Sequence, residues 1–286
     1  LAVDIAPGAP PIDAITWYGN EGSLTLTNMH ISIAVSAGIR FNAPEGATRA
    51  ELNAKGVTVE GGAIGVQAEG CTAANLTLVV VRNASHNGIQ LTRGRKLVAK
   101  ECRAWGCGQH GILVMYWIGG ALDKCVAVSN KAGGITLGGG DPTKEPNNAF
   151  LLTGCRADSN GLSGISLDTT IAGRPGQPVI INAEVTKSSA RQNGIHGINV
   201  TSSSNVTLSN NVVSDNGRCG IGVSADAIAV TGNHASNNKS WGIGFFGRPR
   251  TPEQVGSILA TNLFHANRLG DCNLPGASPA AKPKMS

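Results

Sequence analysis

A motif of the form small or polar residue–Gly–Ile–any residue–aliphatic returns along most of the chain, and it restricts the fold more than any other feature. Full copies occupy residues 87–91, 110–114, 133–137, 163–167, 196–200, 219–223 and 241–245, and weaker copies begin at Gly38 and Ala63. From residue 38, successive anchors are separated by 25, 25, 23, 23, 30, 33, 23 and 22 residues. A period in the low twenties with occasional insertions is typical of a solenoid in which every repeat forms one coil.

The composition agrees with a narrow interior made of small aliphatic layers. Of the 286 residues, 39 are glycine and only 4% are aromatic, so a conventional globular core would be poorly filled. The hydrophobic fraction of 41% excludes a disordered chain, and no apolar run approaches the length of a membrane-spanning helix. The net charge of +5 is spread along the sequence, so nucleic acid is not an expected partner.

A second column of residues supports the repeat register. Counting back nine residues from each anchor gives Met29, Ala54, Val79, Cys102, Cys125, Cys155, Asn211 and Asn233. The count breaks at anchor 197, where counting from Gly194 instead gives Val185. This column predicts an inward-facing stack with a spacing of about 4.8 Å, in which the asparagines bridge backbone groups. Stacked cysteines at that spacing lie too far apart for a disulfide, so we expect buried free thiols.

Asparagines also precede the anchors by four residues, at Asn130, Asn160, Asn216 and Asn238. Since asparagine tolerates the left-handed backbone of tight turns, each coil is interpreted as short strands separated by turns. The segments are too short and too rich in glycine for helices. The sequence therefore predicts an all-β fold, a single right-handed parallel β-helix of about nine to ten coils. The expected organisation is an N-terminal segment or cap over 1–23, the β-helix over 24–275 and a flexible tail over 276–286.

Residues 160–165 (NGLSGI), 216–221 (NGRCGI) and 205–211 (NVTLSNN) carry a family resemblance. They are similar to the repeats of pectin-lyase-like right-handed parallel β-helix proteins, and most similar to alginate-type C5-epimerases and related polysaccharide lyases. The resemblance covers about residues 24–270. It implies an enzyme acting on an acidic, uronate-containing polysaccharide, secreted or extracellular although the chain begins at Leu1 without a signal peptide. The epimerases use an Asp-Pro-His motif, whereas this chain has Asp141-Pro142-Thr143, which favours a lyase over an epimerase.

Three insertions follow the Gly-Ile strand, at residues 138–148, 168–178 and 247–255. Because they occur at the same corner of their coils, they should project on one side and build a groove along one face of the β-helix. Removal of the C5 proton of a uronate needs a base and a cation beside the carboxylate. The candidate catalytic residues are Tyr116, Lys144, Asp141 and Asp168. The candidate substrate-binding residues are Arg40, Gln90, Arg93, Arg95, Trp117, Glu145, Arg174, Asn199 and Arg248.

Several alternatives stay open at this point. Asp141, Glu145 and Asp168 could form the carboxylate pair of a glycoside hydrolase, and they could equally hold Ca²⁺, while no other cofactor is expected. The chain could also be a non-catalytic binding or structural solenoid, such as a phage tail spike or an adhesin. The expected partner is a polysaccharide, and the sequence does not determine an oligomeric state.

Overall fold

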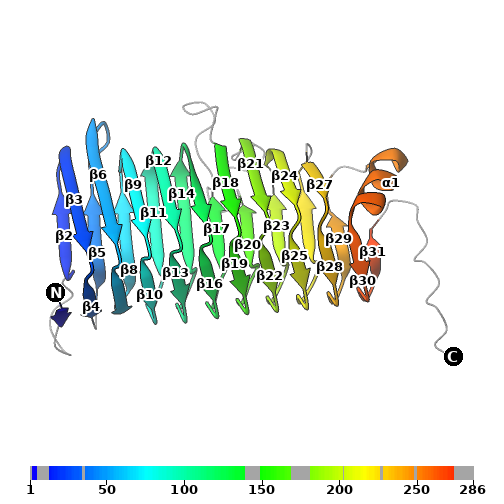
Figure 1. The fold of residues 1–286 in the computed structure, drawn as a ribbon, viewed down its shortest axis with the longest axis horizontal. Coiled ribbons are helices and arrows are strands. Elements are labelled where there is room, and N and C mark those ends of the chain that lie inside the picture. The colour runs from blue at the N-terminus through cyan, green and yellow to red at the C-terminus, as the bar shows by residue number, and fades with distance from the viewer. Residues whose placement is uncertain are drawn as a thin grey trace.

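The computed structural model describes residues 2–4, 13–33, 36–138, 149–168, 181–201, 203–225, 228–247 and 250–273. Three parallel sheets, here called A, B and C, run along the whole solenoid (Figure 1). Sheet A contains β1 (Ala2–Asp4), β4 (His30–Ile33), β7 (Thr58–Gly61), β10 (Val80–Arg82), β13 (Arg103–Trp105), β16 (Val126–Val128), β19 (Arg156–Asp158), β22 (Ser189–Arg191), β25 (Val212–Ser214), β28 (His234–Ser236) and β30 (Leu263–His265).

Sheet B contains β2 (Ile15–Tyr18), β5 (Ala37–Asn42), β8 (Ile64–Glu69), β11 (Ile89–Gly94), β14 (Ile112–Trp117), β17 (Ile135–Gly138), β20 (Ile165–Asp168), β23 (Ile198–Thr201), β26 (Ile221–Ser224), β29 (Trp241–Phe245) and β31 (Gly270–Cys272). Sheet C contains β3 (Glu21–Thr27), β6 (Arg49–Lys55), β9 (Ala73–Thr77), β12 (Lys96–Lys100), β15 (Gly119–Asp123), β18 (Ala149–Thr153), β21 (Ile181–Thr186), β24 (Ser204–Ser209) and β27 (Ile228–Thr231). The chain passes from C to A to B in each coil, so the predicted parallel β-helix is confirmed.

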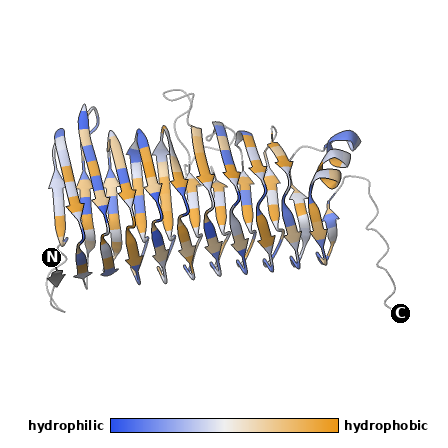
Figure 2. Cartoon of the chain, viewed as in Figure 1, coloured by the Kyte–Doolittle hydropathy of each residue, from blue (hydrophilic) through white to orange (hydrophobic). Residues whose placement is uncertain are grey.

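The interior is one continuous hydrophobic core formed by the alternate residues of each strand. The isoleucine of the repeated motif stacks from coil to coil, as Ile89 on Ile112 and Ile112 on Ile135, and each of these side chains is at most 1% exposed. Figure 2 shows hydrophobic and hydrophilic residues alternating along the strands. No single coil can bury these side chains alone, so stacking of neighbouring coils supplies the hydrophobic stabilisation.

The strand pairing corrects the register of two coils. Val66 pairs with both Ile39 and Ile89, so the second anchor is Gly65 and not Ala63. Ala54 pairs with Leu76 inside sheet C, and Val185 pairs with Leu152, so neither belongs to the predicted column. The column instead holds Val57 and Ser188 at these two coils, because both residues occupy the turn between sheets C and A. The pairs also show that the strand stacks extend before residue 24, since β2 pairs with β5 and β1 with β4.

At the turn from sheet C to sheet A, one position changes from cysteine to serine to asparagine along the solenoid. Ser188 Oγ accepts a hydrogen bond from the backbone N–H of Cys155 at 3.0 Å, and Asn211 Oδ1 accepts one from the N–H of Ser188 at 2.9 Å. Asn233 and Asn262 continue the series towards the C-terminus. The predicted bridging of backbone groups by asparagines is therefore present. Ser188 links the cysteines of the column to its asparagines.

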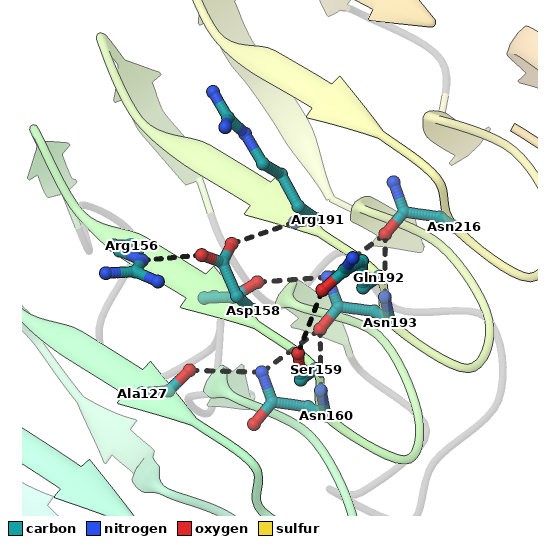
Figure 3. Close-up of polar contacts among 10 residues, drawn as sticks. Ala127, Arg156, Asp158, Ser159, Asn160, Arg191, Gln192, Asn193 and Asn216 are labelled. Carbon is teal, nitrogen blue, oxygen red and sulfur yellow. Dashed lines mark hydrogen bonds and ion pairs between the residues drawn. The ribbon is translucent and has the colours of Figure 1, made fainter. Parts of the chain in front are cut away.

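A second ladder closes the turn from sheet A to sheet B, through Asn130, Asn160, Asn193, Asn216, Asn238 and Asn267. Asn130 accepts from the backbone N–H of Cys107, and from Asn160 onwards each amide accepts hydrogen bonds from the asparagine of the preceding coil (Figure 3). The expectation that these asparagines adopt the left-handed backbone is wrong. The residue before each of them does so instead, as at Ser129 (φ 56°) and Ser159 (φ 56°), which turns the asparagine side chain into the ladder.

Seven free thiols lie inside the solenoid, each at most 9% exposed. Burial raises the pKa of Cys107 to about 11 and that of Cys71 to about 12, so the reactive thiolate is scarce at neutral pH. We expect no thiol of the folded protein to react with Ellman's reagent at the rate of an exposed cysteine. All seven should react after denaturation in guanidinium chloride. Rapid labelling of the native protein would contradict this burial.

The three corners of the solenoid differ in how much they vary. At the corner from C to A, two residues connect the strands in every coil. At the corner from A to B, six residues connect the strands from β10 and β11 to β25 and β26, and fewer connect β7 to β8 and β28 to β29. The corner from B to C varies widely, from Arg95 alone between β11 and β12 to the 139–148 and 169–180 segments. The predicted insertions thus all leave sheet B at this one corner.

A helix that the sequence reasoning did not predict begins in the third insertion, 247–255, and extends beyond it. Helix α1 (Pro252–Thr261) begins with Thr251 as N-cap, whose side chain accepts from the N–H of Gln254 at 3.3 Å, while the Gln254 side chain accepts from Thr251 N–H at 3.0 Å. This reciprocal capping box, followed by proline at the first helical position, is a recognisable start signal. Val255 and Ile258 are buried, so the helix packs against the end of the stack after β27.

Candidate functional site

A groove of about 1100 Å³ lies at the corner between sheets B and C, across four consecutive coils. One side is formed by residues 43–49 and Glu51, and the other by residues 93–96 and 116–118. Between them lie Gly70, Cys71, Thr72 and Ala73, whose small side chains leave the depression. The Thr72 hydroxyl accepts from Ala50 N–H at 2.9 Å and donates to Ala50 O at 3.0 Å, which fixes the adjoining start of β6. We call this depression the corner groove.

Two side chains of the corner groove stand on strained backbone. Because Thr92 pairs with Met115 and Gly94 with Trp117, Arg93 and Tyr116 occupy the same place on adjacent coils, about 4.8 Å apart. Both adopt the left-handed conformation, with φ 52° and 57°, and the preceding coil has Gly70 at this place with φ 74°. Arginine and tyrosine are disfavoured there, whereas glycine is not. Tyr116 is 40% exposed, so both side chains are presented outward at a conformational cost.

The charges of the corner groove are mostly positive. Arg49, Arg93, Arg95 and Lys96 line it, against Glu45 and Glu51. Arg93 forms an ion pair with Glu69 of the preceding coil, while its side chain remains 61% exposed. This contact holds the guanidinium in place without burying it, so a planar anion can still reach its outer N–H groups. The predicted proximity of Tyr116, Arg93 and Arg95 at one corner is thus present in the structure.

Trp117 does not take the role expected for it. The side chain is only 1% exposed and belongs to the core, so it is not available to stack a sugar ring. Its indole lies against Gly94 of the preceding coil, where an added Cβ would come within 2.4 Å of the ring. The left-handed backbone at Tyr116 accounts for this, because it turns Tyr116 outward and Trp117 into the solenoid.

Three other predicted binding residues lie on the outer face of sheet B, outside the corner groove. Arg40 binds the Asp13 carboxylate through Nε at 2.5 Å and through a terminal nitrogen at 3.1 Å. Burial alone would raise the pKa of Asp13, but the bonds from Arg40 and Ser36 outweigh it and lower this pKa to about 2. Gln90 accepts from Asn87 at 2.8 Å, and Asn199 donates to Ser166 at 3.4 Å. These contacts join neighbouring residues of the scaffold.

The remaining predicted site residues fall outside what the structure describes. They are Asp141, Lys144, Glu145, Arg174 and Arg248. Asp168 ends β20 at the B to C corner, but its side chain is not described. Within the described ranges no group of three or more His, Cys, Asp or Glu side chains could hold a metal ion. The Ca²⁺ interpretation therefore stays a prediction about these residues.

The groove also contains Glu45, Arg49 and Glu51, which the sequence reasoning missed. The Pro44-Glu45-Gly46 turn signal was available, but the second anchor was placed at Ala63. With the anchor at Gly65, the corner of that coil falls at residues 70–72, directly after the corner at 43–48 that follows Gly38 and before Arg95. The correct register would have aligned these residues with Arg93 and Tyr116.

His196, one of two histidines before an anchor glycine, is buried and structural. Its Nδ1 accepts the backbone N–H of Cys219 at 3.3 Å, and its ring lies 5.8 Å from that of Phe246. Burial, aided by the charge of Arg218, lowers the pKa of His196 to about 4.

In the unfolded chain the His196 imidazole takes up a proton near pH 6.5, whereas in the folded protein it does so only near pH 4. The contribution of neutral His196 to the unfolding free energy is therefore fully present above pH 6.5 and is lost as the pH falls towards 4. Between pH 7 and pH 5 we expect a loss of about 2 kcal/mol in unfolding free energy. Urea denaturation at several pH values measures it. The His196→Ser variant should lose this dependence, since Ser163 occupies the same place in the preceding coil. An unchanged pH profile in this variant would contradict the assignment.

With the geometry described, comparison identifies the class of protein. Residues 13–172 and 179–264 match the family model described as right handed beta helix region, and the chain belongs to this family. The comparison with curated proteins finds no match. In the part of the chain that the structure describes, no helix combines the length and the apolar character needed to cross a bilayer.

Several solved structures share the fold. The A-module of the Azotobacter vinelandii mannuronan C-5 epimerase AlgE6 is 16% identical, with a TM-score of 0.57 over 87% of this chain and 78% of that one. The periplasmic alginate epimerase AlgG is 15% identical, with a TM-score of 0.60. The match covers 88% of this chain and 62% of the AlgG chain. The Azotobacter vinelandii AlgE4 A-module is 14% identical, with a TM-score of 0.52 over 90% of both chains. At these identities the likeness shows the fold.

Proposed function

We propose that the protein binds an acidic, uronate-containing polysaccharide in the corner groove and cleaves it as a polysaccharide lyase. The observation that carries this proposal is the pair formed by Arg93 and Tyr116, adjacent on successive coils and both held outward on left-handed backbone. An exposed guanidinium next to a phenol matches what proton removal beside a carboxylate requires.

In this reaction Arg93 binds the carboxylate of one uronate and stabilises the negative charge that develops when the C5 proton leaves. Tyr116, acting as the phenolate, takes that proton. The electron pair of the C5–H bond forms the C4–C5 double bond, and the C4–O bond breaks. The departing glycosidic oxygen takes a proton from the resulting Tyr116 phenol, which restores the phenolate and leaves one unsaturated uronate end and one new sugar end. Arg95 and Lys96 supply positive charge for neighbouring uronates.

The structural relatives add support of a general kind. The names of AlgE6, AlgE4 and AlgG describe epimerases of mannuronan or alginate, and epimerisation at C5 also begins with removal of the C5 proton. AlgG is named as periplasmic, which agrees with a protein that meets its polysaccharide outside the cytoplasm. Action in the periplasm or outside the cell is accordingly part of the proposal.

The test is a panel of polyuronates, including alginate and polygalacturonate, incubated with the protein in D₂O with and without Ca²⁺. A lyase produces the ultraviolet absorbance of unsaturated uronates. Deuterium at C5 without cleavage of the polymer would show that the protein is an epimerase and not a lyase. New reducing ends without this absorbance would show that it is a hydrolase. No change in any polymer would favour the binding or structural solenoid.

Arg93→Ala is the informative variant, with Arg103→Ala as its matched control. Both arginines are exposed, but Arg103 lies on sheet A, away from the corner groove. We expect Arg93→Ala to lose about tenfold or more in kcat/KM and Arg103→Ala to lose little, since a charge-assisted pair contributes about 1.5–3 kcal/mol. Equal losses in both variants would speak against the groove.

A further inference from the structure

Three aromatic side chains among the described residues are prominently exposed, and all lie along the same lengthwise edge. Tyr18 ends β2, Tyr116 lies near the end of β14, and Phe246 directly follows β29. They are 66%, 40% and 54% exposed. All three strands belong to sheet B (Figure 1), and the three residues lie at or next to the carboxyl ends of these strands.

Tyr18 and Phe246 are the two ends of one outward-facing row, here called the edge row. Strand register carries this row, one residue per coil, from Tyr18 through Glu69, Thr92, Met115 and Ser224 to Phe246. From β2 to β29 there are nine steps between adjacent strands, a length of about 43 Å. Tyr116 follows Met115 directly, so the reactive corner lies four steps from Tyr18 and five from Phe246.

The edge row is partly exposed at Thr92, Met115 and Ser224 and buried at Gly138. The neighbouring outward row of sheet B is buried over three successive coils, where Leu113 is 7% exposed, Thr136 1% and Ser166 6%, and is partly exposed at Arg40 and Asn199. The edge row is thus the row of sheet B that begins and ends with an exposed aromatic ring.

Phe246 is held as a flat platform at the end of this row. An added Cβ at Gly244 would lie 2.8 Å from the Phe246 ring, so the ring covers the outer face of the sheet at that glycine. The His196 ring supports it from the preceding coils, at 5.8 Å between centroids. An exposed aromatic face packed in this way suits the apolar face of a sugar ring.

We propose that the edge row is an extended binding track for one polyuronate chain lying parallel to the solenoid axis, with Tyr18 and Phe246 as stacking platforms at its ends. This rests on the proposed function, because Arg93 and Tyr116 act on the uronate at the middle of the track. The rise of one coil is comparable to the advance of one pyranose residue, so successive sugars meet equivalent positions of successive coils. Since the reactive corner lies far from both ends, the track favours cleavage of internal bonds.

The experiment measures binding by calorimetry with a uronate trimer and a decamer, using wild-type protein and the Tyr18→Ala, Phe246→Ala and Leu263→Ala variants. Leu263 is the matched control, since it is 68% exposed but lies on sheet A. We expect the decamer to bind more tightly than the trimer. Tyr18→Ala and Phe246→Ala should each weaken decamer binding about threefold to tenfold while leaving the trimer unaffected. Thermal melting confirms that each variant is folded.

The outcomes separate this inference from the function on which it rests. If trimer and decamer bind wild-type protein equally well, or if both aromatic variants bind the decamer as wild type does, the track is wrong and the corner groove stands. A loss in Leu263→Ala as large as in the aromatic variants would also overturn the track. If wild-type protein binds neither oligosaccharide and cleaves no polyuronate, the proposed function itself fails.

Discussion

Tyr116→Phe is expected to lower the rate of polyuronate elimination by about a hundredfold or more, the usual contribution of a positioned proton-transfer group. The change removes only the phenolic oxygen and keeps the ring, so the corner groove and the binding of substrate should be preserved. The measurement is the initial rate of absorbance from unsaturated uronate, at saturating and at low substrate. We expect kcat to fall with little change in KM.

Arg103→Ala is the control here too, because Arg103 lies on sheet A, outside both the corner groove and the edge row, and its loss should leave the rate unchanged. A Tyr116→Phe enzyme that keeps most of its activity would show that another side chain transfers the proton. Tyr116→Gly adds an independent test of backbone strain. It should raise the unfolding free energy by about 0.5–1 kcal/mol while abolishing elimination, because glycine relieves the left-handed φ of 57°. Leu78→Gly, at a left-handed position on another corner, should be stabilising without loss of activity.

Asn216→Ala is expected to destabilise the protein by about 3–5 kcal/mol. The Asn216 side chain is fully buried and donates to Ala190 O at 3.1 Å and to Asn238 Oδ1 at 2.9 Å. It also accepts from the backbone N–H and the side-chain amide of Asn193, both at 3.1 Å (Figure 3). Alanine leaves the partner groups buried without hydrogen bonds, which costs more than the bonds themselves contribute.

Urea denaturation of Asn216→Ala and Asn75→Ala measures this cost. Asn75 also belongs to a pair of stacked asparagines, since its Nδ2 donates to Asn53 Oδ1 at 2.8 Å, but it is exposed on sheet C. Water can replace its partner, so Asn75→Ala should change stability by less than about 0.5 kcal/mol. Similar values for the two variants would show that the buried ladder adds nothing beyond local propensity.

The fold was predictable because each coil repeats the same inward positions, so even approximate counting found the Gly-Ile strand and the cysteine and asparagine stacks. The errors arose where two spacings fit equally well. Ala63 resembles an anchor, but only pairing of Val66 with Ile39 and Ile89 places the true one at Gly65. Likewise Gly194 competes with Gly197 until Ile198 pairs with Ile165.

The site was less predictable, because it depends on which way a side chain points at a corner. Sequence alone placed Arg93, Arg95 and Tyr116 together, since they share one corner on adjacent coils. Alternation of strand residues cannot reveal that Tyr116 has left-handed φ, which sends Trp117 inward and leaves Tyr116 exposed. Arg40 looked available because Asp13, its partner, lies 27 residues away in the sequence.

The unequal corners of the solenoid have a consequence for how such a protein can change. Two corners are lined over part of the solenoid by buried ladders, through Ser188 and the following asparagines at one corner and from Asn130 to Asn267 at the other. An added residue within a ladder would break its hydrogen bonds to the neighbouring coils. Among the residues that the structure describes, the corner between sheets B and C has no such ladder, and its connections range from one residue to the 169–180 segment. Loops of different length can therefore connect sheets B and C at this corner while the strands keep their pairing. Variation in what the proposed groove binds can therefore arise from loops at this one corner, while the ladders and the core remain the same.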